Sequence, residues 1–431
     1  MLRILSVLFT FIIVDLYYFP TTLMAFPTVN SKMVLAVVGL ILFLIQSAKR
    51  KFIPIDYRFT SAVLLALLFS LFCLFTVTFN NTSDYAYATY FVSMAVWLFG
   101  AYAVIYFIRN VHGLVSLELL AHYIILVCVV QCLLALLIDN YMPAKILVDR
   151  IFFQQQDFLN DVNRLYGIGA MLDTAGIRFS IALILISYLI SVAQRTTLAP
   201  YMPIYIVSFL IISIVGNMMA RTTSVGLVLS LLYLLYKQFN SPNEKPFSGQ
   251  VVRYILVFSA VATAILVYFY NTNLDVHNNI RFAFEGFFSL FEKGEWDVGS
   301  NNQLANMVVF PDNMKTWLIG DGYFNNPTYT DPYFTGEFIG GYYMGTDVGY
   351  LRFIFYCGVI GLFFFSSFLI KTANYCAEKF PSKRAVFVFL VFLSFAVWLK
   401  VSSDIFLIFA LFLFVDEEED ELYNERIREI A

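Results

Sequence analysis

The stretch that decides the fold reads Trp317-Leu-Ile-Gly-Asp-Gly-Tyr323, then Gly340-Gly-Tyr-Tyr-Met-Gly-Thr-Asp-Val-Gly-Tyr-Leu-Arg352, then Cys357-Gly-Val-Ile-Gly361. It closes a polar segment, rich in Tyr and Gly, that begins at Arg281 and runs directly into an apolar helix. Almost everywhere else the chain is soluble in lipid. We therefore expect this segment to carry the water-side chemistry of the protein.

The composition of the 431-residue chain is that of a membrane protein. It is 60% hydrophobic and 13% charged, with a mean hydropathy of +0.76. Globular chains are about half apolar and about a quarter charged, so a water-soluble domain would not hide this much apolar surface. The net charge of -3 says little, because charges in a membrane protein act through their placement.

The apolar runs predict an all-α integral membrane protein with about twelve transmembrane helices, because each crossing needs about 20 apolar residues. The expected spans lie near residues 2–19, 33–48, 58–79, 87–108, 114–138, 177–194, 202–219, 222–237, 253–271, 347–370, 385–400 and 402–415. Residues 385–415 are long for one span and short for two, so their division stays open.

The basic residues between these spans predict the orientation, since Lys and Arg collect on the cytoplasmic side. They gather at residues 49–58, 237–253 and 371–384, and counting spans keeps all three clusters on one side. We therefore predict a single polytopic domain, residues 1–415, with long periplasmic loops at 139–176 and 272–346. The acidic residues 416–431 are predicted to form a solvated cytoplasmic tail rather than a metal site.

Six arginines fall on the predicted outer side, against the usual charge bias. Arginine at that boundary is costly unless an anion receives it, and its planar fork fits phosphate oxygens. Such a set could hold a pyrophosphate and stabilise it as a leaving group. For any single arginine, contact with lipid headgroups or with Asp or Glu is an equally good account. The six are Arg150, Arg164, Arg178, Arg221, Arg281 and Arg352.

A carboxylate and an aromatic surface accompany the arginines. Asp347 stands five residues before Arg352, where it could accept a proton from an attacking hydroxyl or cap the helix, and both alternatives stay open. Tyr323, Tyr343 and Tyr350, with Asp321, are predicted to bind sugar, because sugar rings stack on aromatic rings. An aromatic belt at the membrane interface is the competing interpretation.

Other catalytic chemistries find no support in the sequence. The three histidines are scattered, and the five cysteines lie mostly in apolar runs without metal-ligand spacing. We expect an enzyme that uses no metal ion and no cofactor and binds no nucleic acid.

The order of several motifs resembles the bacterial O-antigen and capsular polysaccharide polymerases, the Wzy-type proteins, which share a superfamily with the O-antigen ligases. The motifs are Arg164-Leu-Tyr-Gly-Ile-Gly169, Leu172-Asp-Thr-Ala-Gly-Ile-Arg178, Met219-Ala-Arg-Thr-Thr-Ser224, Arg281-Phe-Ala-Phe-Glu285, Leu318-Ile-Gly-Asp-Gly-Tyr323, and Gly345-Thr-Asp-Val-Gly-Tyr-Leu-Arg352 with Cys357-Gly-Val-Ile-Gly361. They cover residues 150–370.

This resemblance implies a multi-pass protein of the bacterial inner (plasma) membrane with its active site facing the periplasm. It implies transfer of a glycan from undecaprenyl pyrophosphate to the non-reducing end of another lipid-linked repeat unit. Arg221 and Arg281 would then bind the pyrophosphate, with Arg178 and Arg352 assisting, and Arg164 would be a further substrate-binding residue. The implied partners are the lipid-linked oligosaccharide and membrane lipid, with room for a chain-length regulator and a flippase.

Two other functions remain as alternatives. An O-antigen ligase would move finished polymer to the lipid A core, but ligases of this superfamily typically carry a His where this chain has Asp347. A flippase for lipid-linked oligosaccharides is disfavoured by the large outer loops and by the lack of paired, Gly/Pro-broken spans in two matching halves.

Overall fold

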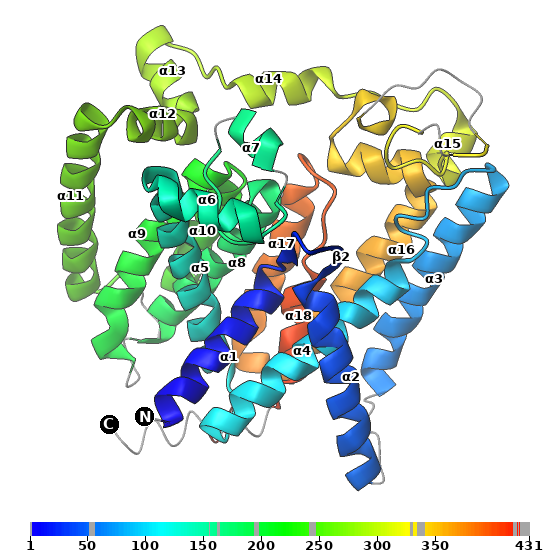
Figure 1. Ribbon diagram of the computed structural model, residues 1–431, viewed down its shortest axis with the longest axis horizontal. Helices are drawn as coiled ribbons and strands as arrows, with labels where there is room; N and C mark the ends of the chain where they lie inside the picture. The colour runs from blue at the N-terminus through cyan, green and yellow to red at the C-terminus, as the bar shows by residue number, and fades with distance from the viewer. Residues whose placement is uncertain are drawn as a thin grey trace. The chain divides into compact units, whose positions relative to one another are not determined.

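The computed structural model describes residues 2–50, 57–154, 156–161, 164–193, 198–240, 247–327, 331–333, 341–416, 420 and 422. This part of the chain is mainly helical (Figure 1). Its contacts form two compact units, and we describe each by itself. The first unit comprises Met1–Phe43, Phe99–Glu295 and Leu411–Ala431, and the second comprises Leu44–Leu98 and Trp296–Ala410.

The first unit is a helical bundle with one small antiparallel hairpin. Its elements, some of which also reach into the second unit, are α1 (Leu2–Tyr18), β1 (Thr22–Leu23), β2 (Phe26–Asn30), α2 (Ser31–Arg50), α4 (Tyr90–His112), α5 (Leu117–Asn140), α6 (Met142–Ile151), α7 (Gln156–Asp161), α8 (Leu172–Ala193), η1 (Ala199–Tyr201), α9 (Met202–Met219), α10 (Thr223–Asn240), α11 (Gly249–Thr272), α12 (Leu274–Ala283) and α13 (Glu285–Lys293).

Helix α8 is the core of this unit. It is buried over almost its whole length and packs against α5, α9 and α10. Small residues allow the close approach, since a Cβ on Gly226 of α10 would lie 2.2 Å from Ser180 Cα of α8. This packing places the turn between α9 and α10 beside the N-terminal end of α8.

The second unit is built around α16. Its elements are α3 (Tyr57–Phe79), α14 (Gly299–Asn306), α15 (Met314–Ile319), η2 (Tyr343–Gly345), α16 (Gly349–Lys379), η3 (Pro381–Lys383), α17 (Arg384–Val397) and α18 (Phe406–Leu413), the last of which reaches into the first unit. Helix α16 packs against α3, α15 and α17, and its backbone leaves helical geometry at Gly358.

Eight helices in the described residues are long and apolar enough to cross a membrane: Ser31–Lys49, Arg58–Phe79, Tyr90–His112, Leu117–Asn140, Leu172–Ala193, Ala199–Met219, Gly249–Thr272 and Gly349–Lys379. The prediction of a helical, multi-pass membrane protein is thereby confirmed in outline.

The finer count of twelve crossings is not shown. Helices α1, α17 and α18 have 17, 14 and 8 residues, and the last four residues of α10 include the polar Lys237, Gln238 and Asn240. Residues 385–415 form two helices, α17 and α18, and each is shorter than the roughly 20 residues of a full crossing.

The described residues of the two predicted loops contain several short helices. Residues 139–176 contain α6, α7 and the start of α8, and residues 272–346 contain α12 to α15 and η2. Local capping explains part of this, since Asn273 accepts hydrogen bonds from Asp275 N and Val276 N and so starts α12. The hydropathy pattern predicts where the chain leaves lipid but not what it forms there.

The start of the acidic tail is held against the first unit. Asp416 pairs with Arg109 at 3.1 Å, and Asp420, which is only 5% exposed, accepts a hydrogen bond from Leu117 N at 2.8 Å. A carboxylate at the N-terminus of α5 is favoured by the helix dipole. The prediction of a solvated tail is therefore wrong for Asp420. Apart from these two residues and Leu422, the tail lies outside the described residues.

Candidate functional site

A polar cavity of about 450 Å³ lies in the first unit where α5, α6, α12, the segment before α8 and the α9–α10 turn meet. It is lined by Ala135, Ile138, Asp139, Lys145, Leu159, Arg164, Leu165, Tyr166, Arg221, Asp275, Asn278, Asn279 and Phe282. Three cations face two carboxylates in this lining, and amide side chains from α12 add hydrogen-bonding capacity.

Two of the predicted anion-binding arginines meet at one phenyl ring in this cavity. The guanidinium carbon of Arg164 lies 3.4 Å from the ring centroid of Phe282, and that of Arg221 lies 3.9 Å from the same centroid. Each contact is a cation–π interaction, which gains strength where water is excluded. The ring holds two like charges close together, and their repulsion is relieved by neighbouring anions.

Carboxylates already engage Arg221. Its Nη1 lies 2.7 Å from Glu285 Oε2, and the adjacent Thr222 hydroxyl donates to Asp173. On Arg164, the buried Nη1 has no hydrogen-bond partner among the described residues. A buried donor without a partner is costly in a protein, so this nitrogen marks where an anionic ligand would be stabilised.

Burial and, to a smaller extent, the nearby charge of Arg221 lower the pKa of Arg164 to about 10, although Asp173 and Glu285 oppose the shift. Burial also lowers the pKa of Arg221, although Glu285 counteracts it. Both groups therefore remain cationic at neutral pH. Because each has lost hydration, an entering anion would gain more from them than from arginines in bulk water.

A network of buried amides positions the segment that carries Arg164. Gln131 of α5 accepts from Ile168 N at 2.9 Å and donates to Ile168 O at 3.0 Å and to Asp15 Oδ1 at 2.8 Å. Gln154 accepts from Gly169 N at 2.6 Å. These bonds pin the turn that follows Arg164 and so reduce the freedom of the guanidinium.

The predicted arginines Arg178 and Arg281 are not among the residues that line the cavity. Arg178 lies in α8 with its guanidinium 5.4 Å from the ring of Phe19. Arg281 forms a bidentate pair with Glu292 at 2.8 and 2.7 Å and packs on Phe288. That pair and a hydrogen bond with Tyr270 raise the pKa of Arg281 above its usual value.

In the second unit, a loop that contains Gly320, Asp321 and Gly322 packs against the break in α16. Asp321 N donates to Phe355 O at 2.6 Å, and Gly322 N donates to Tyr356 O at 3.1 Å. Carbonyl oxygens just before a helix break lack the N–H donor that a continuous helix would supply four residues later. The backbone N–H groups of the loop donate to these oxygens instead. Gly320 has a φ of +79°, and a Cβ there would lie 2.5 Å from Tyr356 O. The Gly-Asp-Gly sequence is therefore an anchor for α16.

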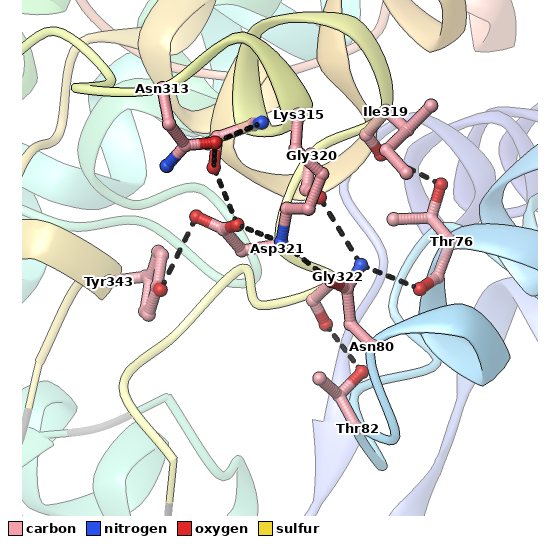
Figure 2. A network of polar contacts seen from close by, with 11 residues as sticks. Thr76, Asn80, Thr82, Asn313, Lys315, Ile319, Gly320, Asp321, Gly322 and Tyr343 are labelled. Carbon is pink, nitrogen blue, oxygen red and sulfur yellow. Dashed lines mark hydrogen bonds and ion pairs between the residues drawn. The ribbon is translucent and has the colours of Figure 1, made fainter.

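Figure 2 shows the Asp321 carboxylate at the centre of a side-chain network. Oδ1 accepts from the Thr316 hydroxyl at 2.7 Å and lies 2.7 Å from Lys315 Nζ. The Tyr343 hydroxyl lies 3.4 Å from Oδ2. Lys315 also donates to Asn80 Oδ1 at 2.7 Å, so the network ties the loop to the end of α3.

Tyr323 and Tyr343 lie side by side with ring centroids 5.3 Å apart and an interplanar angle of 33°. Burial and the Asp331 carboxylate raise the pKa of Tyr323 to about 12, while burial and Asp321 raise the pKa of Tyr343. Both hydroxyls stay protonated at neutral pH and can donate. Three of the predicted sugar-binding residues, Asp321, Tyr323 and Tyr343, are thus brought together.

Tyr350 lies elsewhere in the second unit. Its hydroxyl donates to Phe395 O at 3.0 Å, and its ring packs against Trp398 of the α17 end at 5.7 Å. These contacts give it a packing role in the described structure.

Asp347 and Arg352 form an ion pair at 3.2 Å at the start of α16. The Arg352 side chain is 7% exposed, donates to Phe324 O and Asn325 Oδ1, and stacks on Phe324 at 3.6 Å. The N-cap residue of α16 is Val348, which makes no side-chain cap hydrogen bond. Asp347 is therefore not the N-cap residue of α16, and the pair with Arg352 orients its carboxylate.

Sequence reasoning missed several site residues. Phe282 lies inside the quoted Arg281–Glu285 motif, but only the fold brings Arg164 and Arg221 to its ring. Lys315 and Thr316 precede the Gly-Asp-Gly loop by only a few residues. Their closeness to Asp321 in the sequence could have predicted that they contact its carboxylate. The others gave no local signal, because they meet the site only through packing: Asp139, Lys145, Asp275, Asn278 and Asn279.

Comparison of this chain with protein-family models, with curated proteins and with solved structures finds no match. The resemblance to the polysaccharide polymerases therefore stays a prediction.

Proposed function

We propose that this protein is a glycosyltransferase that polymerises lipid-linked repeat units. The acceptor hydroxyl attacks the anomeric carbon of the donor glycan, a new glycosidic C–O bond forms, and the bond to undecaprenyl pyrophosphate breaks. The hydroxyl proton passes to a carboxylate, and the pyrophosphate leaves with the electron pair. Arginines, rather than a metal ion, supply the countercharge for this leaving group.

One observation carries the proposal: two desolvated guanidiniums meet at Phe282 beside a polar cavity, and Arg164 Nη1 lacks a hydrogen-bond partner among the described residues. A contact between unit charges is worth about 4 kcal/mol at an effective dielectric constant near 20. The pyrophosphate of the donor is already anionic, and it gains further negative charge as its bond to the anomeric carbon breaks. Two such contacts would therefore stabilise the departing pyrophosphate more than the intact donor, which lowers the barrier.

The second unit supplies groups suited to sugar. The paired rings of Tyr323 and Tyr343 offer a stacking surface, and Asp321 and Lys315 lie at its edge with exposed fractions of 20% and 43%. Asp347 is our candidate base, with its carboxylate oriented by Arg352 and 20% exposed.

The proposal includes the finer topology. Twelve crossings would put both termini in the cytoplasm, and the cavity of the first unit would face the periplasm of the bacterial inner membrane. The clusters of Lys and Arg at residues 49–58, 237–253 and 371–384 support this orientation.

The test combines a deletion strain with matched arginine variants. In cells that lack the protein we expect single repeat units and no ladder of surface glycan. Arg164→Ala and Arg221→Ala should reduce polymer by about 100-fold or more, as expected for removing one donor that stabilises a transition state. Arg150→Ala is the control, because Arg150 is exposed at the end of α6 and does not line the cavity.

Western blots of membranes must show equal amounts of each variant. Long polymer stranded on undecaprenyl pyrophosphate in the deletion strain would indicate a ligase, and repeat units trapped in the cytoplasm would indicate a flippase. An unchanged ladder, or wild-type polymer from both cavity variants, would contradict the proposal.

A further inference from the structure

We propose that an apolar groove beside the arginine cavity holds the head-proximal part of a polyprenyl chain. The inference rests on the proposed function, since it assigns the tail of the same lipid carrier. The groove has a volume of about 660 Å³ and is lined by α9 and α11, with Leu136 and Asn140 of α5 and Val276 of α12. Asn140 is its one polar lining residue in the described part of the chain.

The dimensions of the groove suit a chain that follows the bilayer normal. Its lining extends from Val207 to Met218 on α9 and from Phe258 to Phe269 on α11. Each stretch rises about 16 Å at 1.5 Å per residue, roughly half of the 30 Å hydrocarbon core. The groove therefore takes one end of a long chain, and the remainder would extend into lipid.

The groove adjoins the arginine cavity through two elements that line both. On α5, Leu136 and Asn140 line the groove, while Ile138 and Asp139 line the cavity. On α12, Val276 lines the groove.

On the same helix, Asp275 and Asn279 line the cavity. The two elements are joined at this border, because Asn273 donates to Asn140 at 3.4 Å and Asn279 donates to Asp139 at 3.3 Å. The cavity and the groove therefore adjoin along α5 and α12, and we infer that a ligand with its anionic head in the cavity places its chain in the groove.

Charge complementarity selects the occupant. The cavity presents Lys145, Arg164 and Arg221 to a head group, and Arg164 Nη1 has no partner among the described residues. A pyrophosphate offers several oxygens and more negative charge than a phosphodiester, so it fits this set better than an ordinary phospholipid head. A single groove likewise suits one prenyl chain rather than two acyl chains.

The test distinguishes binding of the prenyl tail in the groove from binding of the pyrophosphate head in the cavity. Ala262 of α11 lines the groove, whereas Ala264 of the same helix is exposed and does not. Ala262→Trp should fill the groove, and Ala264→Trp is its matched control. The full-length protein in nanodiscs is titrated with undecaprenyl pyrophosphate, with inorganic pyrophosphate and with phosphatidic acid.

We expect Ala262→Trp to raise the Kd for undecaprenyl pyrophosphate about tenfold, which equals the loss of burial of about two methylene groups. Its Kd for inorganic pyrophosphate should stay within about twofold of the wild type, and Ala264→Trp should change neither. Arg164→Ala should weaken both pyrophosphate ligands.

Three results would overturn the assignment. If the Ala262→Trp and Ala264→Trp variants bind undecaprenyl pyrophosphate with equal affinity, the prenyl tail does not bind in the groove. The proposed function would be unaffected by that result. Phosphatidic acid that binds as tightly and responds in the same way would make this a general lipid groove. Unchanged binding of both pyrophosphate ligands to Arg164→Ala would remove the head site and, with it, the proposed function.

Discussion

At the scale of single residues, Phe282 shows how an apolar side chain can organise a charged site. Its ring receives the guanidiniums of Arg164 and Arg221, which belong to segments on either side of α8 and α9. Without the ring, two arginines would need more carboxylates to stay close, and those carboxylates would compete with an anionic ligand. The aromatic face supports the cations without neutralising them.

Gly358 is the residue on which the second unit depends most directly. Its φ of +65° and ψ of -177° fall in a region that essentially only glycine occupies, and a Cβ would lie 2.1 Å from Leu318 O. We predict that Gly358→Ala destabilises the protein by at least about 1–3 kcal/mol from backbone strain alone. Thermal unfolding in detergent should show a lower Tm than for the wild type.

The control for this change is Gly249→Ala in α11, where an added Cβ meets no atom within 4 Å. Helix propensity makes that substitution neutral or stabilising. If both variants unfold at the same temperature, the break in α16 is not the constraint that we describe.

At the scale of elements, the α12–α13 hairpin connects the predicted Arg281 to the cavity. Arg281 lies between Ile280 and Phe282, and its guanidinium forms an ion pair with Glu292 of α13. Both partners are well exposed, at 38% and 48%, so the pair contributes little stability and is easily opened. A pyrophosphate that binds beside Phe282 could replace Glu292 as the ion-pair partner of the Arg281 guanidinium.

This exchange gives a prediction that separates two roles. If Arg281 contacts the pyrophosphate, Arg281→Ala should lose most polymer, while Glu292→Gln should keep it, because it only frees the guanidinium. Ladder length and repeat-unit number are measured by gel at equal protein levels. Equal losses in both variants would instead mean that the pair merely holds α13.

At the scale of the whole molecule, the crossing of α10 is the element of the topology that most needs a test. Within the part of the chain that the structure describes, eight helices qualify as spans by length and hydropathy, and α10 is not one of them. Yet the proposed orientation requires the chain to change sides between Arg221 and Asn240. If it does not, the arginine cavity and the basic residues after α10 share a side.

Cysteine labelling in spheroplasts resolves this, because all five native cysteines are buried. We predict that Arg150→Cys and Leu274→Cys react with a membrane-impermeant maleimide in intact spheroplasts, since both positions are exposed. Asn240→Cys should react only after permeabilisation. Labelling of Asn240→Cys in intact spheroplasts would contradict the twelve-crossing topology.

Some properties of this protein follow from its sequence alone. The apolar runs determine a helical membrane protein, because the cost of exposing polar backbone to lipid acts locally along the chain. The types of residue in the polar segments also predict an anion site and a sugar surface, and these remain predictions. The structure brings Arg164 together with Arg221, and Asp321 together with Tyr323 and Tyr343.

Only the tertiary structure decides which of these residues meet. It brings Arg164 and Arg221 to the ring of Phe282, and it pairs Arg281 with Glu292 and Asp347 with Arg352. It also shows short helices within the described residues of the predicted loops. The physical reason is that hydropathy is a property of a local stretch, whereas the partner of a charged side chain depends on how segments pack against one another. At Phe282 those segments are far apart in the chain.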